Sequence, residues 1–409
     1  MWWFCVNRDV WSLSATATII SFASSIFWTI LPPYMWDLGF SFWEIAVVYA
    51  SQSIVMLIFS RPLGIYADSV GKKKFIVSEL LVILVAYIFL FCCVKAGYIN
   101  SLSIAAFSIL MGLAWATGSG AFAAAITTSL SREKTGTATG MYVATDSLGW
   151  TIGSFVSGFF ADVLGIGPTL IISMFVICLG FITISFYHET GERRLISIGK
   201  AIRDSWTLSM PSKDNLLVYL FVIVASLNMG AAIFFLVFTI KFYIIVESKT
   251  MYGILSGISG LLSMVTPYFL GRLSEKVSKE KILGVAIAVR VLFMSLLVFS
   301  WDWLITVIFW ITPLWPIITL ELVSLTTDYS IDDRESEAHA IRNIVNMVSQ
   351  TIGSLLGGFM AERFGVKKNV RLMALVLGLG VVVYALGIPL VFILHNRTKE
   401  IVRKQETIL

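Results

Sequence analysis

Residues 64–74 read Gly-Ile-Tyr-Ala-Asp-Ser-Val-Gly-Lys-Lys-Lys, and this polar stretch separates two long apolar runs. One apolar run ends at Gly64 and the next begins at Phe75. A single acid, Asp68, stands between the two glycines, and three lysines close the stretch. We interpret it as a tight cytoplasmic elbow between two membrane helices, because Lys and Arg are enriched on the cytoplasmic side of membrane proteins.

The composition of the chain indicates a membrane protein. Of its 409 residues, 57% are hydrophobic and only 13% are charged, whereas a soluble domain has about 25% charged residues. A spanning helix needs about 20 apolar residues, so the chain has room for roughly a dozen of them. The sparse charge excludes a large soluble enzyme, and the net charge of +5 gives no reason to expect a nucleic-acid partner.

Apolar runs separated by charged or turn-rich breaks predict twelve transmembrane helices. The predicted spans are 11–33, 43–63, 75–95, 99–125, 138–162, 166–187, 215–245, 250–272, 282–300, 303–327, 338–361 and 370–394. They form an N-terminal bundle of six helices at 1–187 and a C-terminal bundle with a short tail at 215–409, joined by a cytoplasmic loop at 188–214. Most Lys and Arg residues fall on one side of these spans, which predicts that both termini are cytoplasmic.

An internal repeat relates the two halves of the chain. Gly-Ser and Gly-Phe at 153–154 and 158–159 recur 200 residues later, at 353–354 and 358–359. The elbow recurs in degraded form at 271–281, where Glu replaces the Asp and Ser replaces the second Gly. Two halves that repeat each other are typical of transporters built from paired bundles.

The elbow resembles the signature loop of the major facilitator superfamily of transporters, and the general pattern is closest to the drug, metabolite and sugar efflux branches. The resemblance implies an all-α fold with two pseudo-symmetric six-helix bundles that work by alternating access. It also implies that Asp68 meets the start of the eleventh helix, where partial positive charge attracts an acid, and so holds the cytoplasmic side closed. The lysines alone could simply fix topology. The candidate gating residues are Gly64, Asp68, Gly71, Lys72, Arg132, Lys134, Gly271 and Glu275.

The proton-coupled drug exporters of the family resemble one another in two sequence features, and this chain lacks both. Ser154 follows Gly153 where those exporters have Gly-Pro, and Ser108 stands where they often have Arg. The glycines on the fifth and eleventh spans are expected to let helices pack closely. These packing candidates are Gly149, Gly153, Gly353 and Gly357.

Ionisable side chains inside the spans are candidates for proton coupling, because a charge at the centre of a membrane helix costs about 2.5–3.5 kcal/mol on insertion scales. Asp146 in the fifth span and Glu321 in the tenth could take up and release a proton. The alternatives are a structural ion pair or hydrogen bond for Asp146, and a water-exposed position for Glu321. Arg290 in the ninth span is expected to reach the lipid headgroups.

Polar and aromatic side chains supply the candidate substrate cavity. Arg342, Asn346 and Gln350 recur at every fourth residue and so share one helix face. Trp115 and Trp315 match across the repeat and could stack on a flat or sugar-like substrate, although packing is the commoner use of Trp. The candidates are Gln52, Trp115, Trp150, Asn228, Trp315, Arg342, Asn343, Asn346 and Gln350. In the same tenth span as Trp315, prolines are expected to interrupt the helix.

These observations predict a secondary transporter of a small organic solute, coupled to protons, with export of drugs or metabolites favoured. Sugar or organic-acid uptake and uncoupled diffusion remain alternatives, as does a non-transporting receptor or scaffold. We expect no enzyme activity, no metal and no other cofactor, since Cys and His do not cluster. We expect a multi-pass monomer in a prokaryotic cell membrane, with a small molecule, protons and lipid as partners. The sequence leaves substrate and direction open.

Overall fold

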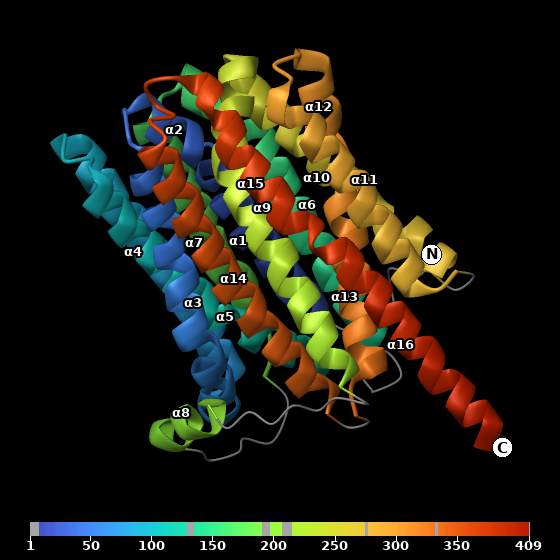
Figure 1. Cartoon of the computed structure of the whole chain (residues 1–409). Coiled ribbons are helices and arrows are strands. Elements are labelled where there is room, and N and C mark those ends of the chain that lie inside the picture. The colour runs from blue at the N-terminus through green and yellow to red at the C-terminus, as the bar shows by residue number, and fades with distance from the viewer. Residues whose placement is uncertain are drawn as a thin grey trace. The chain divides into compact units, whose positions relative to one another are not determined.

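The structure, a computed structural model, describes residues 8–128, 135–189, 197–206, 215–274, 277–331 and 334–408. Long helices dominate these residues (Figure 1). They are α1 (Arg8–Trp28), α2 (Leu31–Asp37), α3 (Phe42–Val70), α4 (Lys72–Ala96), α5 (Ser101–Thr128), α6 (Thr135–Val163), α7 (Ile166–Ser185), α8 (Ile198–Trp206), α9 (Leu216–Val246), α10 (Lys249–Ser274), α11 (Lys279–Phe299), α12 (Trp303–Ile311), α13 (Leu314–Tyr329), α14 (Glu335–Arg363), η3 (Val370–Leu372), α15 (Met373–Ala385) and α16 (Gly387–Ile408).

Every predicted span falls on one of these helices or on two or three consecutive ones, so the all-α fold with twelve spans is confirmed. Within the described residues, ten stretches are long and apolar enough to cross a membrane. The other two spans are α6 and α10, which have 29 and 26 residues and many Gly, Ser and Thr residues. Their length is sufficient for a bilayer, since a helix rises about 1.5 Å per residue.

Prolines explain two of the breaks within spans. Pro313 separates α12 from α13, as predicted, because Pro cannot donate the backbone hydrogen bond that a continuous helix needs. Pro32 and Pro33 lie in the first turn of α2, where an N–H group would have no partner within the helix. The first and tenth spans are therefore each built from two shorter helices.

Helix α4 is apolar on its exposed face as well as on its buried face. Ile83 and Tyr87 are fully buried, whereas Leu81 and Val85 on the other side are 49% and 52% exposed. A large exposed apolar face is unusual on a soluble monomer. This exposed apolar face is suited to contact with lipid. Polar side chains on the buried face of α4 are not explained by lipid contact and need a separate explanation.

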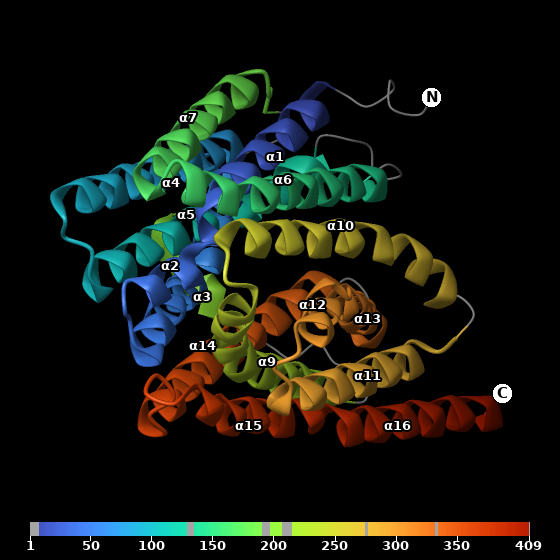
Figure 2. The ribbon, with the colours of Figure 1, turned by 90° about the horizontal axis from the view of Figure 1, so that it is seen from above.

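The chain divides into two compact units. The first contains Met1–Phe40, Ser51–Thr207 and Val246–Met264, and the second contains Ser41–Ala50, Leu208–Ile245 and Val265–Leu409. In the first unit α1 packs against α6 and α7, and α4 packs against α5 and α7 (Figure 2). In the second unit α11 packs against α13, α15 and α16. The domain boundaries at 187 and 215 remain a prediction from the sequence.

The elbow between α3 and α4 turns at Gly71, whose φ of +119° is rarely adopted by other residues. Glu189, just after α7, accepts a hydrogen bond of 2.6 Å from the backbone N–H of Lys72. This contact satisfies one of the N–H groups that lack a partner at a helix start. Lys73 Nζ donates to two backbone carbonyls at and just after the end of α7, at 3.0 and 2.6 Å. The elbow is therefore tied to the end of α7.

Replacing Gly71 with Ala should destabilise the protein. The new Cβ would lie 2.7 Å from the Glu189 carboxylate, and such a backbone conformation costs a non-glycine residue about 1–3 kcal/mol. Gly199→Ala in α8 is the matched control, because the space around Gly199 is open and Ala favours a helix. Thermal unfolding of the detergent-purified variants measures both. Equal midpoints for the two variants would contradict the structural role of Gly71.

Candidate functional site

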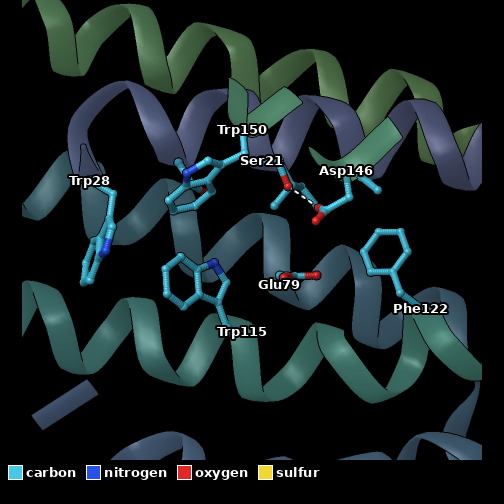
Figure 3. A pocket seen from close by; sticks show the side chains of 10 residues that line it. Ser21, Trp28, Glu79, Trp115, Phe122, Asp146 and Trp150 are labelled. Carbon is cyan, nitrogen blue, oxygen red and sulfur yellow. Dashed lines mark hydrogen bonds between the residues drawn. The ribbon is translucent and has the colours of Figure 1, made fainter. Parts of the chain in front are cut away.

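The first unit contains a cavity of about 350 Å³, with walls from α1, α4, α5 and α6 (Figure 3). Two carboxylates and three indole rings give it a distinctive chemistry. The lining residues are Ala17, Ile20, Ser21, Ser24, Trp28, Glu79, Trp115, Phe122, Asp146 and Trp150. Three of them, Trp115, Asp146 and Trp150, are predicted site residues, and the structure brings these together.

Glu79 was not among the predicted site residues. It is 5% exposed, and its Oε2 atom has no hydrogen-bond partner among the described residues. Gly118 on α5 makes room for it, since a Cβ at Gly118 would collide with the Glu79 carboxylate. The available signal was a lone acid in the third predicted span.

Asp146 on α6 faces the same cavity. Ser21 Oγ on α1 donates a hydrogen bond to Asp146 Oδ1, shown by the dashed line in Figure 3. Helices α1 and α6 approach closely at Gly149 and Gly153, where a Cβ on Gly149 would collide with the carbonyl of Thr18. The small residues thus bring Ser21 within reach of the acid. The hydrogen bond gives Asp146 a structural partner and leaves its second oxygen facing the cavity residues.

Glu79 and Asp146 line the same cavity. Two carboxylates in a poorly solvated site repel each other, and a proton or a cation between them relieves the repulsion. Among the described residues, no three His, Cys, Asp or Glu side chains gather into a metal-binding group.

Three indole rings line the cavity beside the carboxylates. The ring centroids of Trp28 and Trp115 are 5.3 Å apart at an interplanar angle of 64°, and those of Trp115 and Trp150 are 6.5 Å apart at 58°. Figure 3 shows these rings on one side of Glu79 and Asp146. Such tilted contacts are the favoured geometry for aromatic pairs. Trp28 was not among the predicted cavity residues.

Two predicted cavity residues, Gln52 and Asn228, are buried elsewhere. A Cβ on Gly112 of α5 would lie 2.8 Å from the backbone carbonyl of Gln52, which places Gln52 where α3 packs closely on α5. Asn228 Nδ2 donates to the carbonyl of Val224 at 2.8 Å, within its own helix. Neither residue lines the cavity of the first unit.

The predicted polar stripe lies on α14 in the second unit. Arg342 and Asn346 each have a buried polar atom without a hydrogen-bond partner among the described residues. Asn343 Oδ1 accepts a long hydrogen bond of 3.4 Å from Arg342, and Gln350 is half-buried. On the same helix Gly353 and Gly357 face α9, where a Cβ on Gly353 would lie 2.5 Å from the carbonyl of Met229. A role for the stripe in the substrate path remains a prediction.

Arg290 does not reach the headgroups, so that expectation was wrong. It is 5% exposed, and its guanidinium carbon lies 5.0, 5.2 and 5.4 Å from the ring centroids of Trp315, Phe235 and Tyr384. The physical reason is that aromatic faces can replace water around a cation. Trp315 thus contacts Arg290, and its role toward a substrate remains a prediction.

Glu321 on α13 is 1% exposed, so the water-exposed alternative was wrong. Neither of its carboxylate oxygens has a hydrogen-bond partner among the described residues. The charged groups near Glu321 have partners of their own. Lys279 forms an ion pair with Asp328 at 2.7 Å, and Tyr329 Oη donates a hydrogen bond to Glu280 at 2.6 Å. Glu321 is therefore a second buried acid, in a different unit from the cavity.

The gating residues are described only in part. Gly64 of α3 approaches α5, since a Cβ on Gly120 would lie 3.0 Å from the Gly64 Cα. Gly271 lies in α10. The side chain of Asp68 and the residues Arg132, Lys134 and Glu275 lie outside what the structure describes. Their role as a gate remains a prediction.

A multi-pass helical membrane protein with a polar internal cavity has the architecture of a solute transporter. The chain belongs to the Major Facilitator Superfamily, whose family model matches residues 13–323 and 247–407. The resemblance carried by the elbow is thereby confirmed, and the protein is a membrane solute transporter by family; such transporters are generally not enzymes. No curated protein sequence matches the chain significantly.

Three solved structures share the fold over nearly the whole chain. A mutant of the nucleoside transporter NupG has a TM-score of 0.71 at 12% identity and covers 95% of this chain and 99% of its own. The human organic anion transporter MFSD10 (TETRAN) has a TM-score of 0.61 at 12% identity, with coverages of 92% and 99%. The POT family transporter PepTSo has a TM-score of 0.72 at 11% identity, with coverages of 97% and 98%. At such identities these likenesses show the fold alone.

The contact between Gly118 and Glu79 can be tested by a double-mutant cycle. Gly118→Ala should destabilise the protein by about 1–3 kcal/mol, because overpacking a filled site forces side chains to move. The same substitution in a Glu79→Ala background should cost much less, since the colliding carboxylate is gone. Chemical or thermal unfolding of the four proteins gives the coupling. Additive effects would show that Gly118 does not accommodate Glu79.

Proposed function

We propose that this protein moves a small organic solute across the membrane by alternating access and couples that movement to protons. The observation that carries the proposal is the pair Glu79 and Asp146 in the cavity of the first unit. Among the residues that the structure describes, no Lys, Arg or His lines this cavity to neutralise the pair. Ionisable groups inside a membrane protein are costly and mark proton relays or substrate sites. A proton or a cationic group is the partner that this pair lacks.

The two acids of the cavity weigh against the alternatives. An uncoupled facilitator or a non-transporting receptor would keep Glu79 and Asp146 in the membrane at a cost without using them. The neighbours are named as nucleoside and organic anion transporters among others, so they select no single substrate class. The aromatic walls favour export of drugs or metabolites over sugar uptake. We propose a monomer in a prokaryotic cell membrane with both termini cytoplasmic.

Proteoliposomes with an imposed pH gradient test the coupling. A panel of dyes, sugars and organic acids should contain at least one compound whose flux follows the gradient and falls when a protonophore collapses it. Asp146→Asn and Glu79→Gln should each remove gradient-driven accumulation, because an amide cannot carry the proton. Glu400→Gln is the matched control, since Glu400 is exposed on α16.

The outcomes of this experiment separate the candidate acids. No gradient-driven flux of any compound would overturn coupled transport. Intact coupling in Asp146→Asn and Glu79→Gln, combined with lost coupling in Glu321→Gln, would move the proton to the second unit. Thermal midpoints of all variants must be compared first, so that a folding defect is not read as a loss of coupling.

The gate is a separate proposal and has a separate test. Asp68→Asn should increase labelling, from the cytoplasmic side, of a cysteine introduced among the cavity residues, because the acid that holds that side closed is gone. The rate of reaction with a membrane-impermeant maleimide is the measurement, and Glu400→Gln again serves as control. Unchanged labelling would contradict the clasp.

A further inference from the structure

We propose that the cavity in the first unit binds an organic cation, a protonated amine or quaternary ammonium group carried on an apolar or aromatic body. This inference rests on the proposed transport function and specifies its substrate class. It starts from two observations that are independent of each other. One is a buried carboxylate with an oxygen that has no hydrogen-bond partner among the described residues, and the other is a wall of indole rings beside it.

The carboxylates supply the charge that selects the ligand. Ser21 donates to one oxygen of Asp146, whereas Glu79 Oε2 is buried in the cavity wall without a hydrogen-bond partner among the described residues. Glu79 is 95% buried, by its exposed fraction of 5%. An anionic ligand would be repelled by this pair, and a neutral ligand would leave both acids without a counter-charge. A cation satisfies them.

The indole rings supply the surface that an organic cation prefers. Trp presents the strongest face for cation–π attraction among the aromatic side chains, and its effect grows when water is excluded. Trp28, Trp115 and Trp150 form a continuous wall next to the carboxylates, and Phe122 lies on the other side of them in Figure 3. A bare metal ion would instead need several oxygen ligands, and the carboxylates among the described lining residues are only Glu79 and Asp146. The cavity of about 350 Å³ lies within the size range of small-molecule sites.

Within the described part of the chain, the surrounding helices bring no other charge into the cavity. Helices α5 and α7 carry no Asp, Glu, Lys, Arg or His. The remaining charges of α1 and α4 lie at helix ends, at Arg8, Asp9, the three elbow lysines and Lys95. On α6 the other acid, Asp162, accepts hydrogen bonds from Thr250, and Arg61 of α3 does not line the cavity. Protons and an organic cation would therefore compete for the same two carboxylates, which favours exchange in opposite directions.

Three probes of similar shape and different charge test the inference on the purified full-length protein. They are benzyltrimethylammonium, its neutral carbon analogue neopentylbenzene, and the anion benzenesulfonate. Isothermal titration in detergent, with empty micelles subtracted, should show the cation binding at least about tenfold more tightly than either of the others. Binding of the cation should weaken as the pH is lowered, because a protonated carboxyl carries no charge. Equal binding of the neutral analogue, or a preference for the anion, would overturn the inference.

Variants locate the binding on the named side chains. Glu79→Gln and Asp146→Asn should each weaken cation binding by about tenfold and reduce its pH dependence. Trp115→Leu should weaken binding more than Trp115→Phe does, since Phe keeps an aromatic face. Glu400→Gln should leave binding unchanged. Cation binding that survives both carboxylate substitutions would place the ligand elsewhere and contradict the proposal. The three-probe comparison on the unaltered protein stands even if a variant fails to fold.

The proposed transport function and the proposed cation binding would be contradicted by different experimental results. Cation binding at this site without flux driven by a pH gradient would retain the site and overturn the proposed function. Gradient-driven flux of a sugar or an organic acid, with no preference for the ammonium probe, would retain the function and overturn this inference.

Discussion

The cost of burying a charge in an apolar interior is the constraint on which the first unit depends. A carboxylate removed from water loses several kcal/mol of hydration unless another group replaces it. Two glycines of this unit position the acids. Gly118 leaves space for Glu79, and Gly149 lets α1 approach α6 so that Ser21 reaches Asp146. The close contacts between the helices therefore determine where the two acids lie.

Two other buried charges among the described residues, Lys241 and Arg290, contact groups of the second unit that replace part of their lost hydration, and they contrast with Glu79. Lys241 Nζ donates to the carbonyl of Leu297 at 2.6 Å and lies 4.7 Å from the ring centroid of Trp301. Arg290 is surrounded by three aromatic rings. Both cations thus have a carbonyl or aromatic rings of their own unit beside them. One oxygen of Glu79 has no hydrogen-bond partner among the described residues, and Glu79 lines a cavity large enough for a small molecule. A buried charged group becomes a functional candidate when its own unit does not supply all of its hydrogen-bond partners or a counter-charge.

The fold could be predicted from the sequence because lipid imposes length and apolarity on every spanning helix, and prolines mark where a span breaks, as at Pro313. Asp146, Trp115 and Trp150 could be predicted because they stand in the middle of apolar runs. Glu79 could not, since its importance depends on the helix face it occupies and on the absence of a Cβ at Gly118, a residue 39 positions away. Arg290 was misjudged for the same reason: three rings from distant helix segments, not lipid headgroups, surround it.

The internal repeat shows that the two halves share a backbone pattern and differ in chemistry. Gly153 and Gly353 match across the repeat, and each stands where its helix packs closely on a neighbour. The third predicted span of one half carries Glu79, whereas the corresponding span of the other half carries Arg290, with the opposite charge. Close helix packing tolerates only small residues at its contacts, so those positions remain alike. A charge inside a helical bundle has no such packing requirement once a partner is available. Aromatic rings of its own unit surround Arg290, whereas Glu79 stands beside a cavity that could admit a positive charge from outside the unit.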